Sequence, residues 1–209
     1  MSSALPEGAL ARLDALLASG GRRLLGLVAP PGAGKSTLAA ALSAARPGQV
    51  QVLPMDGFHL AQAELERLGR ADRKGAPDTF DAAGFVALLQ RLRAQRPGDP
   101  VVYAPEFRRE LEEPVAGAVA VAPETPLLLV EGNYLLLQDE GWAPVAGLLD
   151  ACWYLDLPDA VRVPRLVARH VAHGRSPEAA LEWVMRSDEA NARRIVAVRG
   201  RADWVLSGT

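Results

Sequence analysis

Apolar residues in this chain gather in short continuous runs that alternate with longer segments of helical periodicity. Runs typical of buried strands occupy residues 24–28, 50–55, 127–130, 151–155 and 204–206, with shorter strand candidates at 101–103 and 115–121. Helices are predicted at 10–17, 35–45, 61–68, 82–95, 142–149, 158–173 and 177–200. Because strands alternate with helices and are apolar on both faces, the pattern predicts an α/β fold with a parallel sheet covered on both sides.

Three residues refine the predicted helix boundaries. Asp81 and Ser176 are expected to cap the helices that follow them, since both residue types accept hydrogen bonds from the first turn. Pro164 is expected in the first turn of its helix or at a kink, because proline cannot donate within a helix.

The most specific motif in the chain is Ala29-Pro-Pro-Gly-Ala-Gly-Lys35-Ser36-Thr37, at a strand-to-helix junction. Glycines there let backbone N–H groups turn towards phosphate oxygens at the positive end of a helix. Lys35 can reach the β- and γ-phosphates of ATP, and the Ser36 hydroxyl can ligate Mg²⁺. Ala29 replaces the first glycine of the motif, which alanine can do where φ is negative. We predict that ATP is bound by Pro31, Gly32, Ala33, Gly34, Lys35, Ser36 and Thr37.

Two acidic residues follow predicted buried strands. Glu131 ends the run 127–130, where such folds place a carboxylate beside Mg²⁺ and within reach of the substrate. Asp56 ends the second strand, so it is expected in the same crevice as the phosphate loop. There it can orient a substrate hydroxyl and accept its proton. The alternative is that Asp56 only shapes the turn before Gly57.

The acceptor side of the crevice is predicted from the segment after Asp56. His59 is interpreted as a substrate ligand or a structural histidine. Arg73 and Lys74 lie in a loop rich in Gly and Pro, which can form a cradle for an anion or polyol or a solvated loop. Tyr103 is expected to line the acceptor pocket or to pack.

A late helix carries Arg162, Arg165 and Arg169 at spacings that place them on one face. A mobile helix of this kind can close over ATP, exclude water and neutralise charge on the transferred phosphoryl group. Arg165 and Arg169, with Lys35, are therefore candidate catalytic residues. The alternative is a solvated basic face.

The composition fits a folded protein without an internal disulfide. The chain has 209 residues, 49% of them hydrophobic and 23% charged, and a formal net charge of −2. This charge does not favour nucleic acid or an anionic membrane as partner. Its one cysteine, Cys152, is expected to be a buried thiol in a reducing compartment. Without a signal-like start or a run long enough to cross a bilayer, the chain is expected in the cytoplasm.

Together these motifs resemble the P-loop kinase family that includes uridine kinases, bacterial type I pantothenate kinases and phosphoribulokinases. Within that family the chain looks most similar to bacterial nucleoside/nucleotide kinase-like proteins and to kinases associated with fructose transport, described as fructokinase-like. The resemblance runs from about residue 24 to the C-terminus and is carried, besides the phosphate loop, by segments 55–59, 73–81, 103–107, 131–136 and 165–191.

The resemblance implies a P-loop NTPase three-layer sandwich, with a five-stranded parallel core sheet and an arginine-bearing helical lid. It also implies that Asp56 is the base and that the lid arginines lie near the phosphates. One departure, besides Ala29, is the sequence Phe107-Arg108-Arg109 where relatives often have Phe-Asp-Arg. If that aspartate contacts the acceptor in relatives, acceptor choice differs here.

The sequence thus predicts an ATP-dependent kinase that transfers the γ-phosphoryl group to a hydroxyl of a small metabolite. The acceptor stays open among a sugar such as fructose, a nucleoside such as uridine and a pantothenate-like alcohol. One alternative is a regulatory protein, associated with a transporter, that binds or hydrolyses ATP without an acceptor; another is a nucleotide-dependent interaction or structural protein. We expect residues 1–209 to form one kinase domain with a lid at about 158–195, and ATP and Mg²⁺ as ligands. A homodimer is common among relatives, although no exposed stripe of this sequence requires one.

Overall fold

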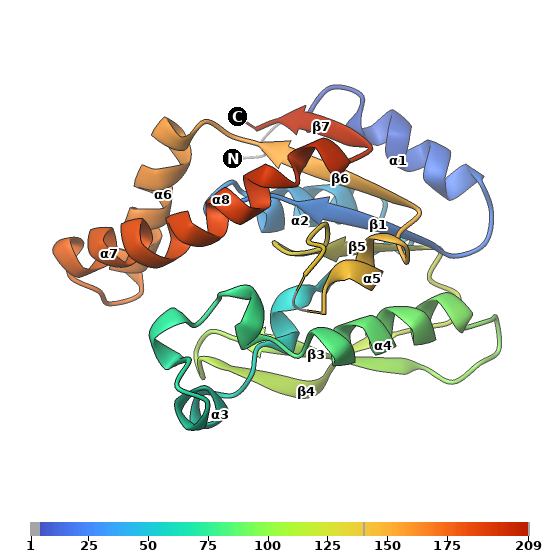
Figure 1. Cartoon of the computed structure of the whole chain (residues 1–209). Coiled ribbons are helices and arrows are strands. Elements are labelled where there is room, and N and C mark those ends of the chain that lie inside the picture. The colour runs from blue at the N-terminus through green and yellow to red at the C-terminus, as the bar shows by residue number, and fades with distance from the viewer. Residues whose placement is uncertain (1–4, 140, 209) are drawn as a thin grey trace.

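The computed structural model describes residues 5–139 and 141–208, and its centre is a parallel sheet of five strands in the order β2-β5-β1-β6-β7 (Figure 1). The strands are β1 Arg23–Val28, β2 Val50–Pro54, β5 Leu127–Glu131, β6 Ala151–Asp156 and β7 Trp204–Ser207. All neighbouring pairs run parallel. The predicted five-stranded parallel core is therefore confirmed, with strand ends within two residues of those expected.

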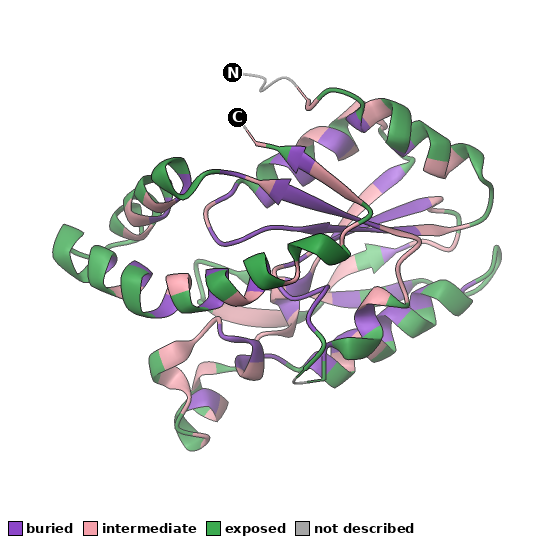
Figure 2. Ribbon diagram, turned by 45° about the horizontal axis from the view of Figure 1, so that its top comes forward, coloured by how far each residue is buried: buried purple, intermediate pink, exposed green. Residues whose placement is uncertain are grey.

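Helices cover both faces of this sheet, which makes a three-layer sandwich. On one face lie α1 Ala9–Ala18 and α2 Lys35–Ala45, and on the other α4 Ala82–Ala94, α5 Ala143–Ala146 and α8 Glu189–Ala197. Alternate residues of β1 enter the two cores, Leu25 and Leu27 the first and Leu24 and Val28 the second. Because both faces are covered, the strands are apolar throughout and are largely drawn as buried in Figure 2.

A second sheet is the antiparallel hairpin of β3 Val102–Arg108 and β4 Glu113–Val121. The sequence predicted only short strands here, separated by a charged segment at 108–113. Both strands extend into that segment, so the connecting turn is confined to residues 109–112. The hairpin packs on the 3₁₀ turn η1 Met55–Phe58, which follows β2.

The other elements lie at the carboxyl end of the central strands (Figure 1). They are α3 Gln62–Arg67, the 3₁₀ turns η2 Ala71–Arg73 and η3 Pro77–Thr79, α6 Asp159–Ala172, α7 Pro177–Trp183 and the π-helical turn η4 Val184–Asp188. The 3₁₀ turn η5 Arg199–Arg201 precedes β7 at the opposite end of that strand. The helix predicted from Ser176 to near Gly200 is confirmed as a continuous helical segment from 177 to 197, with the π-helical turn η4 between α7 and α8.

The predicted helix boundaries are largely confirmed. Asp81 Oδ1 accepts from the N–H of Gly84 at 2.8 Å, and Ser176 Oγ accepts from the N–H of Ala179 at 3.2 Å. Pro164, however, lies inside α6 and beyond its first turn. The predicted helix at 142–149 is reduced to α5 because its flanking residues form turns.

Cys152 is buried as expected, and desolvation raises the pKa of its thiol to about 12. Across residues 5–139 and 141–208, no helix combines the length and apolar character needed to span a membrane.

Candidate active site

The phosphate loop joins β1 to α2 and presents the N-terminus of that helix. Gly32 and Gly34 adopt φ values of 81° and 94°, in the left-handed region that glycine tolerates best. Ala29 is outside that region, since the only described non-glycine residue with positive φ is Glu112. Alanine therefore fits the position of the motif's first glycine without backbone strain.

Gly32 also allows the lid helix to pack directly on the loop. A Cβ atom at Gly32 would lie 2.9 Å from the backbone oxygen of Arg162 and 3.0 Å from Cβ of Leu166. The loop and α6 are thus in contact, with Pro31 and Ala33 buried between neighbouring elements. Gly34, Ser36 and Thr37 remain exposed at the start of α2.

Lys35 is 8% exposed, and its Nζ donates to the Ala29 oxygen at 3.1 Å. Burial lowers the pKa of Lys35, while the Glu131 and Asp56 carboxylates partly offset that effect. The ammonium group therefore lies in the field of two acids, Glu131 at the end of β5 and Asp56 in η1 after the neighbouring strand β2. Its hydrogen bond to a neutral carbonyl leaves donors for a phosphate group.

Ser36 and Glu131 bring two oxygen ligands together. The Ser36 hydroxyl donates to Glu131 Oε2 at 3.1 Å, although they are 95 residues apart in sequence. Burial raises the pKa of Glu131, and the charge of Lys35 lowers it. A hydroxyl and a carboxylate are the hard oxygen donors that Mg²⁺ prefers, so this pair fits the predicted metal site.

Asp56 lies in η1, directly after β2, and lines two adjoining cavities. The smaller, about 340 Å³, is also lined by Ser36 and Glu131. The larger, about 760 Å³, is also lined by His59 and Lys74. Asp56 therefore lies where the cavity beside Ser36 and Glu131 meets a larger one, which Pro31 of the phosphate loop also lines.

His59 is packed into the fold at the wall of the larger cavity, and its role as a substrate ligand stays a prediction. It lines the larger cavity, and its ring packs between Phe80 and Phe107 at centroid distances of 4.0 and 4.8 Å. Its Nδ1 lies 2.7 Å from the backbone oxygen of Asp56, an atom that can only accept, so Nδ1 carries the proton. Burial lowers the pKa of His59, which favours the neutral ring.

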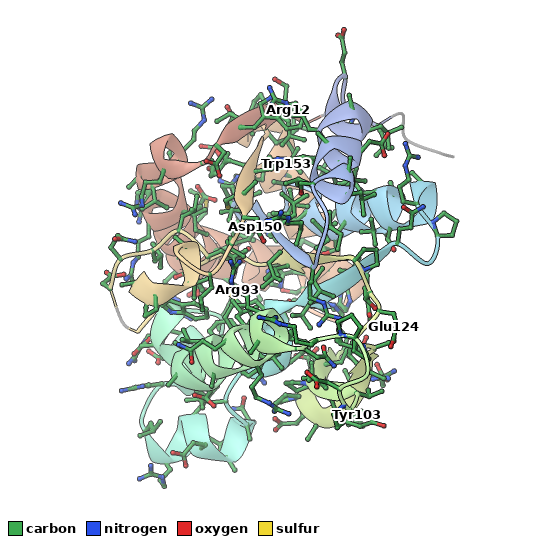
Figure 3. The ribbon with its side chains drawn as sticks, turned by 90° about the vertical axis from the view of Figure 1, so that its right-hand side faces the viewer. Arg12, Arg93, Tyr103, Glu124, Asp150 and Trp153 are labelled. Carbon is green, nitrogen blue, oxygen red and sulfur yellow. The ribbon has the colours of Figure 1, made fainter. Side chains whose placement is uncertain are left out.

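Two predicted substrate residues lie elsewhere. Tyr103 is 60% exposed on the outer side of the hairpin (Figure 3), because successive strand residues alternate and Val102 and Ala104 take the buried face. Arg73 lines neither cavity; its guanidinium pairs with Asp78 at 2.8 Å. Both corrections reflect side-chain directions that the local sequence does not encode.

The three lid arginines have different surroundings despite their common helical spacing. Arg162 is 1% exposed, pairs with Asp159 at 2.8 Å and Glu189 at 2.6 Å, and donates to the Pro31 oxygen at 3.1 Å. It therefore fastens α6 to the phosphate loop, and the solvated-face alternative is wrong for it.

Of the two lid arginines predicted to be catalytic, Arg169 lines the larger cavity, whereas Arg165 is exposed and outside the lining of both cavities. Arg169 is exposed at the cavity wall. Desolvation by the surrounding protein and then the charge of Arg109 lower the pKa of Arg169, with Asp188, Asp56 and Glu131 acting in the opposite direction. Arg169 thus lies in the same field as the acids beside the phosphate loop.

Sequence reasoning missed several residues that line the larger cavity. Arg109 reaches it from the hairpin turn and lines the smaller cavity as well. The sequence signal that could have indicated Arg109 was Phe107-Arg108-Arg109, which differs from the Phe-Asp-Arg often found in relatives. Others have no local signal and are brought in by the fold: Gln62, Glu113, Asn133, Trp183 and Asp188.

Comparison with known proteins finds relatives whose names describe them as kinases. A "putative uridine kinase" of Schizosaccharomyces pombe is 37% identical over 181 residues, which cover 81% of this chain and 76% of the relative. A solved structure from Silicibacter sp. TM1040, a "putative fructose transport system kinase", is 40% identical with a TM-score of 0.84, and the match covers 94% of this chain and 98% of that one. No family model matches the chain.

The fold is shared more widely. YFH7 from Saccharomyces cerevisiae, a "putative P-loop containing kinase with a circular permutation", has a TM-score of 0.79 at 18% identity, with 96% of each chain covered. The phosphate loop on a parallel sheet, and the identity to relatives over most of their length, agree with one another. On these grounds the chain belongs to the P-loop kinase family.

Proposed function

We propose that this chain is an ATP-dependent kinase that transfers the γ-phosphoryl group of Mg·ATP to a hydroxyl group of a small metabolite. The observation that supports this most directly is the position of Asp56, which lines both the cavity beside Ser36 and Glu131 and the larger cavity beyond it. The larger cavity, about 760 Å³, has room for an acceptor next to this carboxylate and is also lined by Pro31 of the phosphate loop.

In this proposal Asp56 accepts the proton of the acceptor hydroxyl as its oxygen bonds to the γ-phosphorus. The bond from that phosphorus to the β–γ bridging oxygen breaks, and ADP leaves. Lys35 and Arg169 neutralise negative charge on the transferred group, and Arg165 joins them when the lid closes. Positioning and charge neutralisation supply most of the rate.

Ser36 and Glu131 would hold Mg²⁺, directly or through water. When bound, the ion would offset the negative charge of the ATP phosphates. The backbone N–H groups of residues 31–37 would surround the phosphates, because the glycines there turn the loop around the start of α2.

We also propose that the whole chain works as one kinase domain whose lid spans about 158–195. Residues from α6, α7 and η4 line the larger cavity together with residues from the loops after β2. Arg162 links the lid to the phosphate loop and to Glu189. The lid can therefore respond to what the loop binds.

The test is acceptor-dependent ADP release by wild type and Asp56→Asn, against uridine, cytidine, fructose, ribose and pantothenate, with an acceptor-free control. We expect the variant to lose about a hundredfold or more in acceptor-dependent rate while ATP still binds. Asp72→Asn is the matched control, because Asp72 is exposed and lines neither cavity. ATP turnover that ignores every acceptor and is equal in both proteins would favour the regulatory alternative.

A further inference from the structure

Two cationic residues that line the larger cavity, Lys74 and Arg109, differ from the arginine that precedes each of them in whether the charge is paired with a carboxylate. Arg73 pairs with Asp78 and Arg108 pairs with Glu106, each at 2.8 Å, and neither arginine lines the cavity. The next residues, Lys74 and Arg109, do line it, and among the described residues neither forms an ion pair with a carboxylate. In each of these two neighbouring pairs, the residue that faces the cavity is therefore the one whose positive charge is not paired with a carboxylate.

Lys74 is held in place by neutral acceptors. Its Nζ donates to the backbone oxygen of Glu112 at 2.8 Å and to Gln62 Oε1 at 3.3 Å, and lies 5.6 Å from the ring centroid of Phe107. These contacts orient the ammonium group without cancelling its charge. An ammonium group has three donors, so one remains for a ligand.

Arg109 reaches the same cavity from the hairpin turn, two residues after Phe107. After the larger effect of burial, the positive charges of Lys74 and Arg109 both act against protonation of His59 and lower its pKa. The ring of Phe107 contacts His59 and lies under Lys74. Two cations from separate segments, the loop after α3 and the hairpin turn, therefore flank one part of the cavity.

The two cations differ in how near they lie to the phosphate loop. Arg109 lines the smaller cavity too, with Ser36 and Glu131, whereas Lys74 lines only the larger one. Lys35 and Arg169 already serve the phosphoryl group in the proposed mechanism. Lys74 is thus a cation on the acceptor side that the reaction at phosphorus does not use.

Two acidic residues from the same part of the hairpin, Glu112 and Glu113, also line the cavity. Glu113 Oε1 accepts from the N–H of Gln62 at 2.9 Å, and its Oε2 is buried. In the described part of the chain neither carboxylate forms an ion pair with Lys74 or Arg109, so the two cations remain available to an anion in the cavity.

We propose that the acceptor carries, besides the hydroxyl that is phosphorylated, an anionic group that Lys74 and Arg109 bind. The shared chemistry is that of a carboxylate or phosphate oxyanion, which is matched by a lysine and an arginine. The acceptor is then a hydroxy acid or a phosphorylated polyol, sugar or nucleoside, and not an uncharged polyol, sugar or nucleoside. This inference rests on the proposed kinase function and specifies its substrate class.

The experiment uses pairs of acceptors that differ in the anionic group: glycerate with glycerol, pantothenate with pantothenol, a hexose phosphate with its hexose, and a nucleoside monophosphate with its nucleoside. ADP release is measured with the full chain and Mg·ATP at saturation. We expect the anionic member of at least one pair to exceed its neutral partner by about tenfold or more in kcat/KM. The carboxylate and phosphate pairs distinguish the two sources of the anion.

Variants then locate the anion. Lys74→Gln and Arg109→Gln should each raise KM for the anionic acceptor about tenfold, and Lys74→Arg should restore part of the loss. The KM for ATP should stay within about twofold for Lys74→Gln, because Lys74 is outside the cavity beside Ser36. Arg108→Gln, at the end of β3 directly before Arg109, is the matched control and should leave both constants unchanged.

The outcomes separate this inference from the function on which it rests. Turnover of neutral members at rates equal to or above those of their anionic partners would overturn the anion site and leave the kinase intact. Unchanged KM in Lys74→Gln and Arg109→Gln would do the same. ADP release that depends on no member of any pair would overturn the proposed function, and the anion site with it.

Discussion

At the scale of single residues, the position of Asp56 depends on its neighbour Gly57. A Cβ atom at Gly57 would lie 2.2 Å from the backbone oxygen of Pro105, which is far inside van der Waals contact. The hairpin therefore packs against η1 at a distance that only glycine allows. The same contact fixes the backbone that carries the Asp56 carboxylate between the two cavities.

We predict that Gly57→Ala destabilises the protein by about 1–3 kcal/mol, because the clash is with backbone and cannot be relieved by a side-chain rotation. Acceptor-dependent activity should fall as η1 shifts, while ATP binding is retained. Urea unfolding and ATP titration measure the two effects. Gly200→Ala, where an added Cβ meets no atom within 4 Å, is the control and should stay within about 0.5 kcal/mol of wild type.

His59 gives a prediction for pH. Burial holds its folded-state pKa below the ordinary value of 6.5, so the unfolded chain binds a proton first as the pH falls. This contribution to stability is full above pH 6.5 and is lost as the pH falls from there through the folded pKa. His59→Asn should flatten the dependence of unfolding free energy on pH in that window. Equal slopes for variant and wild type would contradict this account.

At the scale of elements, the lid is fastened by a buried charge and not only by apolar packing. Arg162 links α6 to Pro31 of the phosphate loop and to Glu189 of α8. Glu189 is 14% exposed, so removal of Arg162 would leave a nearly buried carboxylate without its partner. The helix sequence predicts a basic stripe here, whereas the packing turns one of its members inward.

We predict that Arg162→Met costs roughly 3 kcal/mol of unfolding free energy, because breaking a buried pair leaves one charge uncompensated. The double variant Arg162→Met with Glu189→Leu should recover about 1 kcal/mol or more of that loss. A double-mutant cycle in urea measures the coupling. Strictly additive losses would show that Arg162 acts through packing alone.

At the scale of the whole molecule, ligand binding at the loop should stabilise the entire chain. The loop contacts α2, the central sheet and, through Gly32 and Arg162, the lid. A ligand that binds only the folded state raises its stability by mass action. If the chain is one domain, the gain should appear in a single cooperative transition.

We predict that a Mg²⁺ complex of a non-hydrolysable ATP analogue, at a hundredfold its Kd, raises the unfolding free energy by about 2.7 kcal/mol. Lys35→Met should remove most of this gain. Lys74→Met, which changes the chain's other lysine, should keep it, because Lys74 lies outside the phosphate loop. Thermal unfolding with and without the analogue measures both. Two separate unfolding transitions, of which only one shifts when the ATP analogue is added, would contradict the single-domain proposal.

The sequence by itself determined the features that depend on local pattern. Continuous apolar runs specify strands buried on both faces, and the loop that ends in Lys35 and Ser36 carries its own turn residues. A carboxylate placed directly after a parallel strand, such as Asp56 or Glu131, must emerge at the common edge of the sheet. These inferences use only residues that are close together in sequence. They also use the rule that the carboxyl ends of parallel strands lie at the same edge of the sheet.

Only the tertiary structure decided which side chains face the site. Tyr103 points outward and Arg109 reaches inward because the register of the hairpin and its packing on η1 set their directions. Arg162 is buried because α6 lies against Gly32, although its spacing matches that of Arg169. Such choices depend on contacts between segments far apart in the chain, and those contacts exist only once the segments have packed together.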